Sequence, residues 1–168
     1  MSASFLKRIN KEIQLYKKDN FSFPNLILQP SDNLNIWYFI IHDLKDTDYE
    51  GGIFLGKVIL PDKYPFKAPE FIFLTENGRF EVNKKICTSF SGFHPELYSP
   101  SWNILSMLTG LVSFINDDQD SIESKGIGGI LTTKEEKQKI CQDSVEKIKE
   151  NEVVLTYFKD FFDILKLN

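Results

Sequence analysis

Hydrophobic positions near the N-terminus of the chain recur at helical spacing. Phe5, Leu6, Ile9, Ile13 and Tyr16 are separated by intervals of three, four and seven residues. Such intervals place side chains on one face of an α-helix. The pattern therefore predicts an amphipathic helix that packs against the rest of the protein through this face.

The segments that follow alternate between strand-forming runs and turn residues. β-Branched and aromatic residues dominate positions 35–42, 53–60 and 71–74, and a shorter apolar run occupies 26–28. Because short turns such as Gly51-Gly52 separate consecutive runs, we expect a four-stranded antiparallel meander.

A long irregular stretch separates the predicted sheet from further helices. Residues 68–102 are mostly irregular and rich in Asn, Gly, Ser and Pro, and a stretch of this length in a compact domain is often functional. Residues 103–115 are apolar nearly all round, which is typical of a buried helix. Helical patterns return over 132–149 and 152–166. We therefore predict an α+β fold with an N-terminal helix, a four-stranded antiparallel meander, a long loop, a buried central helix and two C-terminal helices.

Length and composition fit one globular domain spanning residues 1–168. Hydrophobic residues make up 42% and charged residues 26% of the chain, which is ordinary for a globular protein. No apolar run approaches the ~20 residues that span a bilayer, and the N-terminus has no apolar signal core. We therefore expect a protein of the cytoplasm.

The charge of the chain is acidic overall but uneven. A formal net charge of −4 supplies no basic field for nucleic acid, so nucleic-acid binding is not expected. Basic residues nevertheless gather in the first predicted helix, where Glu12 is the only acid before position 19. This basic helix is either a solvated face or a docking surface for an acidic partner. Its basic residues are Lys7, Arg8, Lys11, Lys17 and Lys18.

The two cysteines lie in different settings. Cys87 follows Lys84 and Lys85 inside the long loop, and positive neighbours favour the nucleophilic thiolate. The alternative is a small packed core residue. Cys141 lies at helical spacing with Ile148, so we interpret it as a packed thiol. Neither cysteine has the CxxC spacing of a metal site, and no metal is expected.

A cysteine hydrolase would need a histidine base beside its thiol. The chain has two histidines, of which His42 ends a predicted strand and is interpreted as structural. His94 could reach Cys87, although we interpret it as a brace of the loop. Without a clear base, Cys87 suits the acceptance of an already activated acyl group, because exchange between thiols needs little proton transfer.

Three further segments combine turn residues with aromatic or polar side chains. Asn77-Gly78 is a strong turn signal, and Asn77 either closes a plain turn or donates its amide to an oxyanion near Cys87. Phe66, in a proline-rich break, is an exposed aromatic contact or a core plug. The segment Tyr98–Trp102 is a second loop of proline and aromatic residues.

In their order and spacing, these features resemble the ubiquitin-conjugating enzyme family and its UBC fold. The resemblance rests on the basic first helix, YPFKAP at Tyr64–Pro69, KIC at Lys85–Cys87, YSPSW at Tyr98–Trp102 and the buried helix that follows. The His-Pro-Asn triplet that most members carry before the cysteine is missing here. The segments TENGRF, FHPELYSPSW and LTGLVSF resemble the J-type branch, which is tied to endoplasmic-reticulum quality control.

The resemblance implies a transferase that needs no cofactor of its own. An activating enzyme passes ubiquitin to the cysteine as a thioester, and a RING-type ligase promotes its transfer to substrate lysines, with hydroxyl acceptors as an additional expectation. An acidic residue after the buried helix often orients the incoming amine in this family, although the acidic run can also be a solvated loop. The implied site residues are Lys7, Arg8 and Lys11 for the activating enzyme, Phe66, Tyr98 and Pro100 for the ligase, and Cys87, Asn77, Asp117 and Asp118 for catalysis.

The remaining expectations concern location, assembly and rival functions. A monomer is expected in the cytoplasm, or at the cytosolic face of the endoplasmic reticulum if the C-terminal anchor of the J-type branch follows residue 168. One alternative is a catalytically inactive UBC-like or RWD-type binding module. Another is a cysteine hydrolase with His94 as its base.

Overall fold

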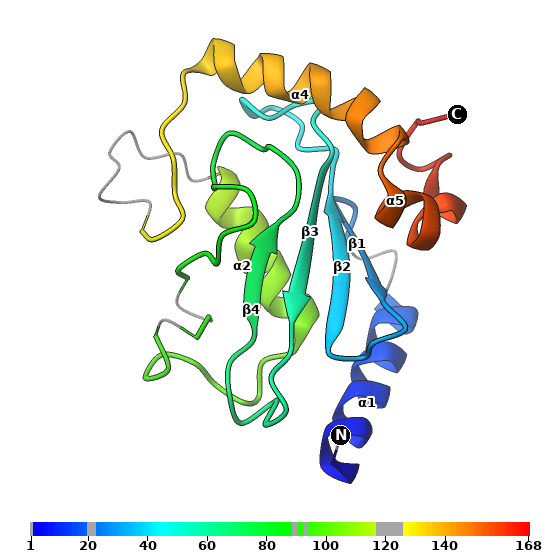
Figure 1. Ribbon diagram of the computed structural model, residues 1–168, viewed down its shortest axis with the longest axis vertical. Coiled ribbons are helices and arrows are strands. Elements are labelled where there is room, and N and C mark those ends of the chain that lie inside the picture. Colours follow the sequence, from blue (N-terminus) through cyan, green and yellow to red (C-terminus); the bar gives the residue numbers. More distant parts are fainter. Residues whose placement is uncertain (1, 20–22, 89–90, 93, 117–125) are drawn as a thin grey trace.

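The computed structural model describes residues 2–19, 23–88, 91–92, 94–116 and 126–168. Helices flank a sheet of four strands, which confirms the predicted α+β fold (Figure 1). The elements are α1 (Ala3–Asp19), β1 (Leu26–Pro30), β2 (Ile36–Ile41), β3 (Phe54–Ile59), β4 (Glu70–Phe73), α2 (Ile104–Asn116), α4 (Lys134–Lys149), α5 (Glu152–Tyr157) and a 3-10 turn at Lys159–Phe161.

The sheet is the antiparallel meander that the alternating runs predict. Its strands lie in the order β1-β2-β3-β4, each paired with its neighbour in the chain. Phe39 on β2 stands opposite Gly56 on β3, and a Cβ atom at Gly56 would lie only 2.2 Å from the Phe39 ring. Glycine is therefore required at this position, because the aromatic ring fills the space of a side chain.

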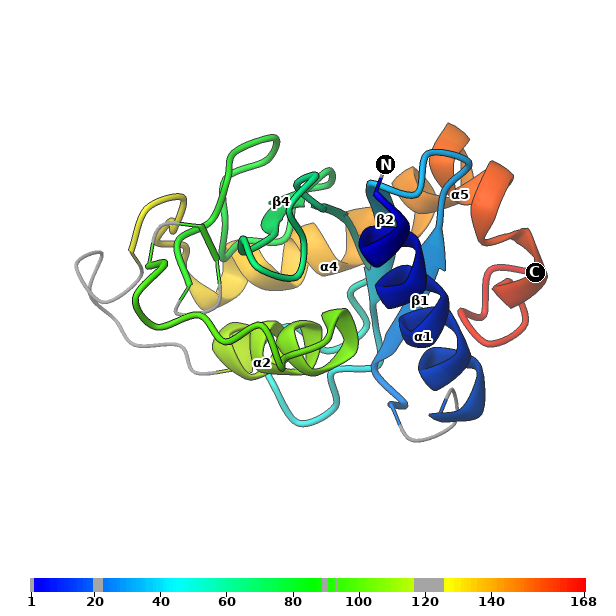
Figure 2. The same cartoon turned by 90° about the horizontal axis from the view of Figure 1, so that it is seen from below.

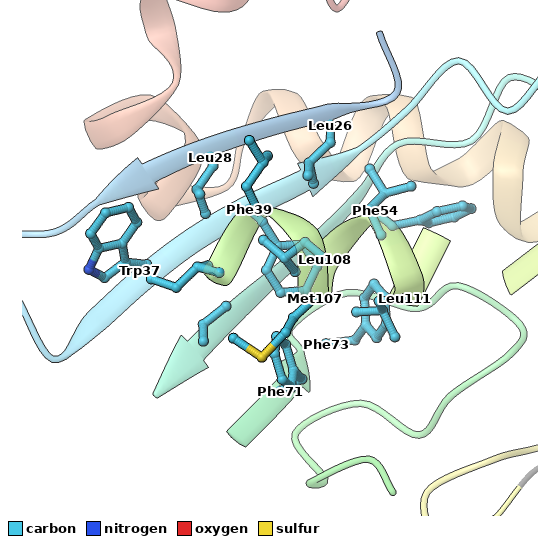
Figure 3. Packing of buried hydrophobic residues seen from close by; sticks show 14 of the residues in the cluster. Leu26, Leu28, Trp37, Phe39, Phe54, Phe71, Phe73, Met107, Leu108 and Leu111 are labelled. Carbon is cyan, nitrogen blue, oxygen red and sulfur yellow. The ribbon is translucent and has the colours of Figure 1, made fainter. Parts of the chain in front are cut away.

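Side chains alternate between the two faces of the sheet. On one face, Leu28, Phe39 and Phe73 pack against Met107 and Leu108 of α2 (Figure 3). This contact explains the apolar character of α2, although the helix is not buried all round, since Phe114 on its outer side is 38% exposed. The alternation follows from the two-residue period of a strand.

The C-terminal segment covers the other face of the sheet. Ile40 and Leu55 pack there with Phe158 and Leu165, and α2 and α5 lie on opposite sides of β1 and β2 (Figure 2). The final helix, predicted to run to residue 166, ends at Tyr157. The chain then turns, and Phe158 and Leu165 both pack onto the sheet beyond the end of this helix.

The first helix packs as its spacing predicts. Phe5, Ile9 and Tyr16 are buried, and the backbone N–H of Leu28 donates a hydrogen bond of 2.9 Å to the Tyr16 hydroxyl. None of the helices in the described ranges is both long and apolar enough to cross a membrane.

Candidate active site

Backbone hydrogen bonds on both sides fix Cys87 at the edge of the sheet. The N–H of Ile86 donates to the carbonyl of Phe71 at 3.1 Å, and the N–H of Cys87 donates to the carbonyl of Ile127 at 2.9 Å. Ile86 is fully buried, whereas Cys87 is partly exposed. The fold thus holds the backbone at Ile86 and Cys87 in place, while the Cys87 thiol stays within reach of solvent.

The segment after residue 125 forms one wall beside this thiol. It pairs with the stretch before Cys87, because Ile130 donates to Arg79 and Glu81 donates to Gly128 (Figure 1). Gly126 has a φ of +68°, and a Cβ atom there would lie 4.0 Å from the sulfur of Cys87. The sequence contains three glycines here, but it does not indicate that one of them, Gly126, stands against the cysteine.

A histidine and a glutamate extend from the thiol. The Nε2 atom of His94 lies 3.1 Å from the sulfur of Cys87, and its Nδ1 atom lies 3.2 Å from Oε1 of Glu96. The three side chains therefore form a connected row of polar groups. We interpreted His94 from the sequence as a loop brace, and the structure shows that it contacts the thiol directly.

A tight turn presents His94 to the cysteine. The hydroxyl of Ser91, which is buried, accepts from the N–H of Thr88 at 3.0 Å and donates to its carbonyl at 2.9 Å. The N–H of His94 in turn donates to the carbonyl of Ser91 at 3.3 Å. These bonds hold the backbone on both sides of the turn, which limits the positions open to the imidazole.

Asn77 uses its whole side chain within its own turn. Its Oδ1 accepts from the N–H groups of Arg79 and Phe80 at 2.9 and 2.8 Å. Its amide donates to the carbonyls of Thr75 and Phe80 at 3.2 and 3.3 Å, and the residue is 1% exposed. In this arrangement both amide hydrogens are already donated, so Asn77 closes the turn, and the oxyanion role stays a prediction.

The acidic catalytic candidates cannot be placed. Asp117 and Asp118, together with the neighbouring Asp120, lie outside the described residues. Their role in orienting the incoming amine stays a prediction. Within the ranges that the structure does describe, no cluster of three or more His, Cys, Asp or Glu side chains could hold a metal ion.

Cys141 contrasts with Cys87, and its predicted packing is confirmed. It is 2% exposed and lies in the core between α4 and the sheet. Burial raises the pKa of its thiol to about 11, against which a hydrogen bond from the backbone of Gly52 is the smaller effect. A thiol in this state is a poor nucleophile at neutral pH.

The basic face of α1 divides into free and engaged residues. Lys7 and Lys11 are exposed. Arg8 instead donates from Nε to Glu12 at 2.6 Å and from Nη1 to the carbonyl of Pro100 at 2.9 Å. The guanidinium therefore ties α1 to the loop before α2. In the sequence, Arg8 differs from the neighbouring lysines in being the only arginine of this helix and in standing four residues before Glu12.

The residues expected to contact a ligase lie on two loops that touch one another. Phe66 is 77% exposed, which excludes the core-plug interpretation. The hydroxyl of Tyr98 donates to the carbonyl of Pro65 at 2.8 Å, so the second loop supports the first. Pro100 is exposed beside them. The three predicted ligase contacts thus belong to one continuous surface.

A buried carboxylate that the sequence analysis did not single out joins these parts. Glu12 accepts hydrogen bonds from Arg8, from the Tyr64 hydroxyl and, at 2.8 Å, from the backbone N–H of Ile104. Two features of the sequence point to this carboxylate: its position on the apolar face of α1 between Ile9 and Ile13, and its being the only acid before position 19.

Comparison with known proteins identifies related sequences over most of the chain. The sequence model of the family described as ubiquitin-conjugating enzyme matches residues 8–148. The "Ubiquitin-conjugating enzyme E2 J2-like" of Dictyostelium discoideum is 34% identical, over 91% of this chain and 86% of its own length. The "Ubiquitin-conjugating enzyme E2 J1" of Homo sapiens is 38% identical, over 86% of this chain. The match spans 43% of that relative, less than half of its length.

Proposed function

We propose, because this chain belongs to the ubiquitin-conjugating enzyme family, that Cys87 accepts ubiquitin from the activating enzyme and carries it as a thioester. The relatives named J1 and J2-like place the chain in the J-type branch. The observation that carries the proposal is the contrast between the two thiols. Cys87 is partly exposed in the matched region, whereas Cys141 is buried with a raised pKa.

The charging step is an exchange between two sulfur atoms. The thiolate of Cys87 attacks the carbonyl carbon of ubiquitin's thioester on the activating enzyme, and the thiolate of that enzyme leaves. In the second step an acceptor amine attacks the new thioester, a tetrahedral oxyanion forms, and the Cys87 sulfur is expelled. We retain Asn77 as an oxyanion donor, a role that requires one of its amide hydrogens to leave its carbonyl partner. We also retain Asp117 and Asp118 as the groups that orient the incoming amine.

Two surfaces are proposed for the protein partners. Lys7 and Lys11 offer exposed positive charge on α1 for an acidic surface of the activating enzyme. Phe66 offers a RING-type ligase an exposed aromatic anchor, of the kind that dominates binding energy at interfaces. Tyr98 and the exposed Pro100 complete that surface.

The finer aspects of the function rest on the J-type resemblance alone. One is that the protein acts in protein quality control at the cytosolic face of the endoplasmic reticulum. The other is that it transfers ubiquitin to hydroxyl groups as well as to lysines. The resemblance also supports a monomer that needs no cofactor of its own.

The proposal is tested by charging with ubiquitin, activating enzyme and ATP. The wild type and Cys141→Ala should form an adduct that a thiol reductant removes, and Cys87→Ala should form none. Loss of the adduct in Cys141→Ala, or its persistence in Cys87→Ala, would overturn the assignment. A wild type that never charges would indicate the inactive binding module, and hydrolysis of ubiquitin esters would indicate the hydrolase.

A further inference from the structure

We propose that His94 is the catalytic base of the transfer step and that Glu96 positions it. His94 would take the proton from the acceptor as it attacks and deliver this proton to the departing sulfur of Cys87. This inference rests on the proposed function, because it assumes the Cys87 thioester. It adds to the transfer step a catalytic group, the His94 imidazole, which the sequence motifs did not assign.

The first argument is the distance between the base and the reacting bond. Nε2 of His94 lies 3.1 Å from the sulfur of Cys87, within hydrogen-bond reach. The thioester carbon is bonded directly to this sulfur, so an acceptor that attacks the carbon arrives close to the imidazole. The His94 side chain is 42% exposed, which leaves a path for the acceptor from solvent.

The second argument is the orientation of the ring. The carboxylate of Glu96 lies 3.2 Å from Nδ1 and can only accept a hydrogen bond when ionised. It therefore favours the tautomer with a proton on Nδ1 and a free electron pair on Nε2, directed at Cys87. The contact with His94 also lowers the pKa of Glu96, after a larger effect of its own backbone N–H, so the carboxylate is ionised at neutral pH.

Protons and electrons balance in this step. The neutral amine attacks the thioester carbon, and its N–H proton passes to Nε2 of His94. The carbon–sulfur bond breaks, and its electron pair goes to the sulfur of Cys87. The imidazolium then gives the same proton to this sulfur, which restores the thiol and the neutral imidazole. No further reactant is needed.

Few other groups in the described part of the chain contact the ring of His94. Within the described ranges, Cys87 and Glu96 are the only titratable side chains in hydrogen-bond or ion-pair contact with its ring. Lys84 and Lys85 stand near in sequence, but they form ion pairs of 2.8 and 2.7 Å with Glu81 and Glu70. A change in the pH profile of transfer after substitution of His94 can therefore be assigned to this row of groups.

The experiment separates transfer from charging. Wild type, His94→Gln and Glu96→Gln are first charged with ubiquitin, the activating enzyme is stopped by chelation of magnesium, and discharge onto free lysine is followed between pH 6 and 9. Glutamine at position 94 keeps a polar side chain near the sulfur but cannot take up a proton. We expect discharge to slow on the order of 10²-fold, as general base catalysis typically contributes at least this much.

The pH profile distinguishes catalysis from support of the loop. The neutral fraction of free lysine itself rises with pH, so each rate is divided by that fraction before comparison. The corrected rate of the wild type should rise as the imidazole loses its proton, and the corrected rate of His94→Gln should stay flat. Glu96→Gln should slow discharge less, because the imidazole remains as the base and only the carboxylate that favours the Nδ1-protonated tautomer is lost. Glu81→Gln is the matched control, since it removes a carboxylate that pairs with Lys84 rather than with His94. It should discharge like the wild type.

The outcomes are separable from those of the proposed function. If His94→Gln charges normally and then discharges at the rate and with the pH profile of the wild type, His94 is not the base. If the variant melts at a lower temperature while the pH profile stays unchanged, it is only a loop brace, and the proposal is also wrong. Failure of the wild type to charge would instead remove the proposed function itself.

Discussion

Glu12 on α1 accepts a hydrogen bond from the hydroxyl of Tyr64, although 52 residues separate them in the chain. Burial, and next the Glu12 carboxylate, raise the pKa of this hydroxyl, so it stays protonated and donates. The other oxygen of Glu12 accepts from the N–H of Ile104 at the start of α2. One carboxylate thus joins the first helix, the segment that carries Phe66, and the helix behind the active site.

Removal of this carboxylate should destabilise the fold. In Glu12→Ala, the Tyr64 hydroxyl and the N–H of Ile104 lose their buried acceptor, and we expect a loss of about 3 kcal/mol in the free energy of unfolding. Tyr64→Phe removes one donor only and should cost about 1 kcal/mol. Urea unfolding followed by circular dichroism measures both values. A Glu12→Ala protein as stable as the wild type would contradict the role of this carboxylate.

Asn77 should contribute to stability through its turn. Asn77→Ala leaves the buried N–H groups of Arg79 and Phe80 without their acceptor, so we expect a loss of about 2 kcal/mol in thermal or urea unfolding. Asn77→Asp is the matched variant, because it keeps an acceptor oxygen and loses the donating amide. If Asn77→Asp charges normally but discharges roughly 10²-fold more slowly onto free lysine, the amide serves the oxyanion. Unchanged discharge would leave the turn as its only role.

The two thiols should differ in reactivity towards iodoacetamide. With a pKa of about 11, Cys141 is thiolate in roughly one molecule in a thousand at pH 8, and its burial further limits access. Mass spectrometry of the native protein should therefore find Cys87 modified well before Cys141. Both should react after unfolding in urea. Equal labelling in the folded protein would contradict the buried state of Cys141.

His42 should make stability depend on pH below neutrality. Its pKa is lowered from the ordinary 6.5, chiefly by burial. Asp43 opposes this effect, and Lys166 lowers the pKa by a smaller amount than Asp43 raises it. The unfolded chain thus binds a proton at a higher pH than the folded protein does. Stability should fall as pH drops below 6.5 and should stop falling, for this group, below the folded pKa. Urea unfolding of wild type and His42→Gln between pH 7.5 and 5.5 measures the difference, and identical slopes would exclude this contribution.

The local pattern of hydrophobic and polar residues was sufficient to predict most of the fold. The two-residue alternation of Trp37, Phe39 and Ile41 predicts a strand and the face that it buries, because strand geometry alone sets that period. Helical spacing likewise predicts α1 and the packing of Cys141. The ordered motifs around Cys87 identified the family, which the comparisons confirm.

Only the tertiary structure decided which groups surround the thiol. Ile127 and Gly126 reach Cys87 from about forty residues further along the chain, and Glu12 meets Ile104 across 92 residues. Contacts of this kind produce no periodic pattern in the sequence, because they depend on how separate helices, strands and loops pack together. His94 is only seven residues from Cys87, yet its approach depends on the turn that Ser91 closes. The sequence by itself thus predicted the sheet and pointed to Cys87 as the reactive thiol, and tertiary packing decided which groups lie around that thiol.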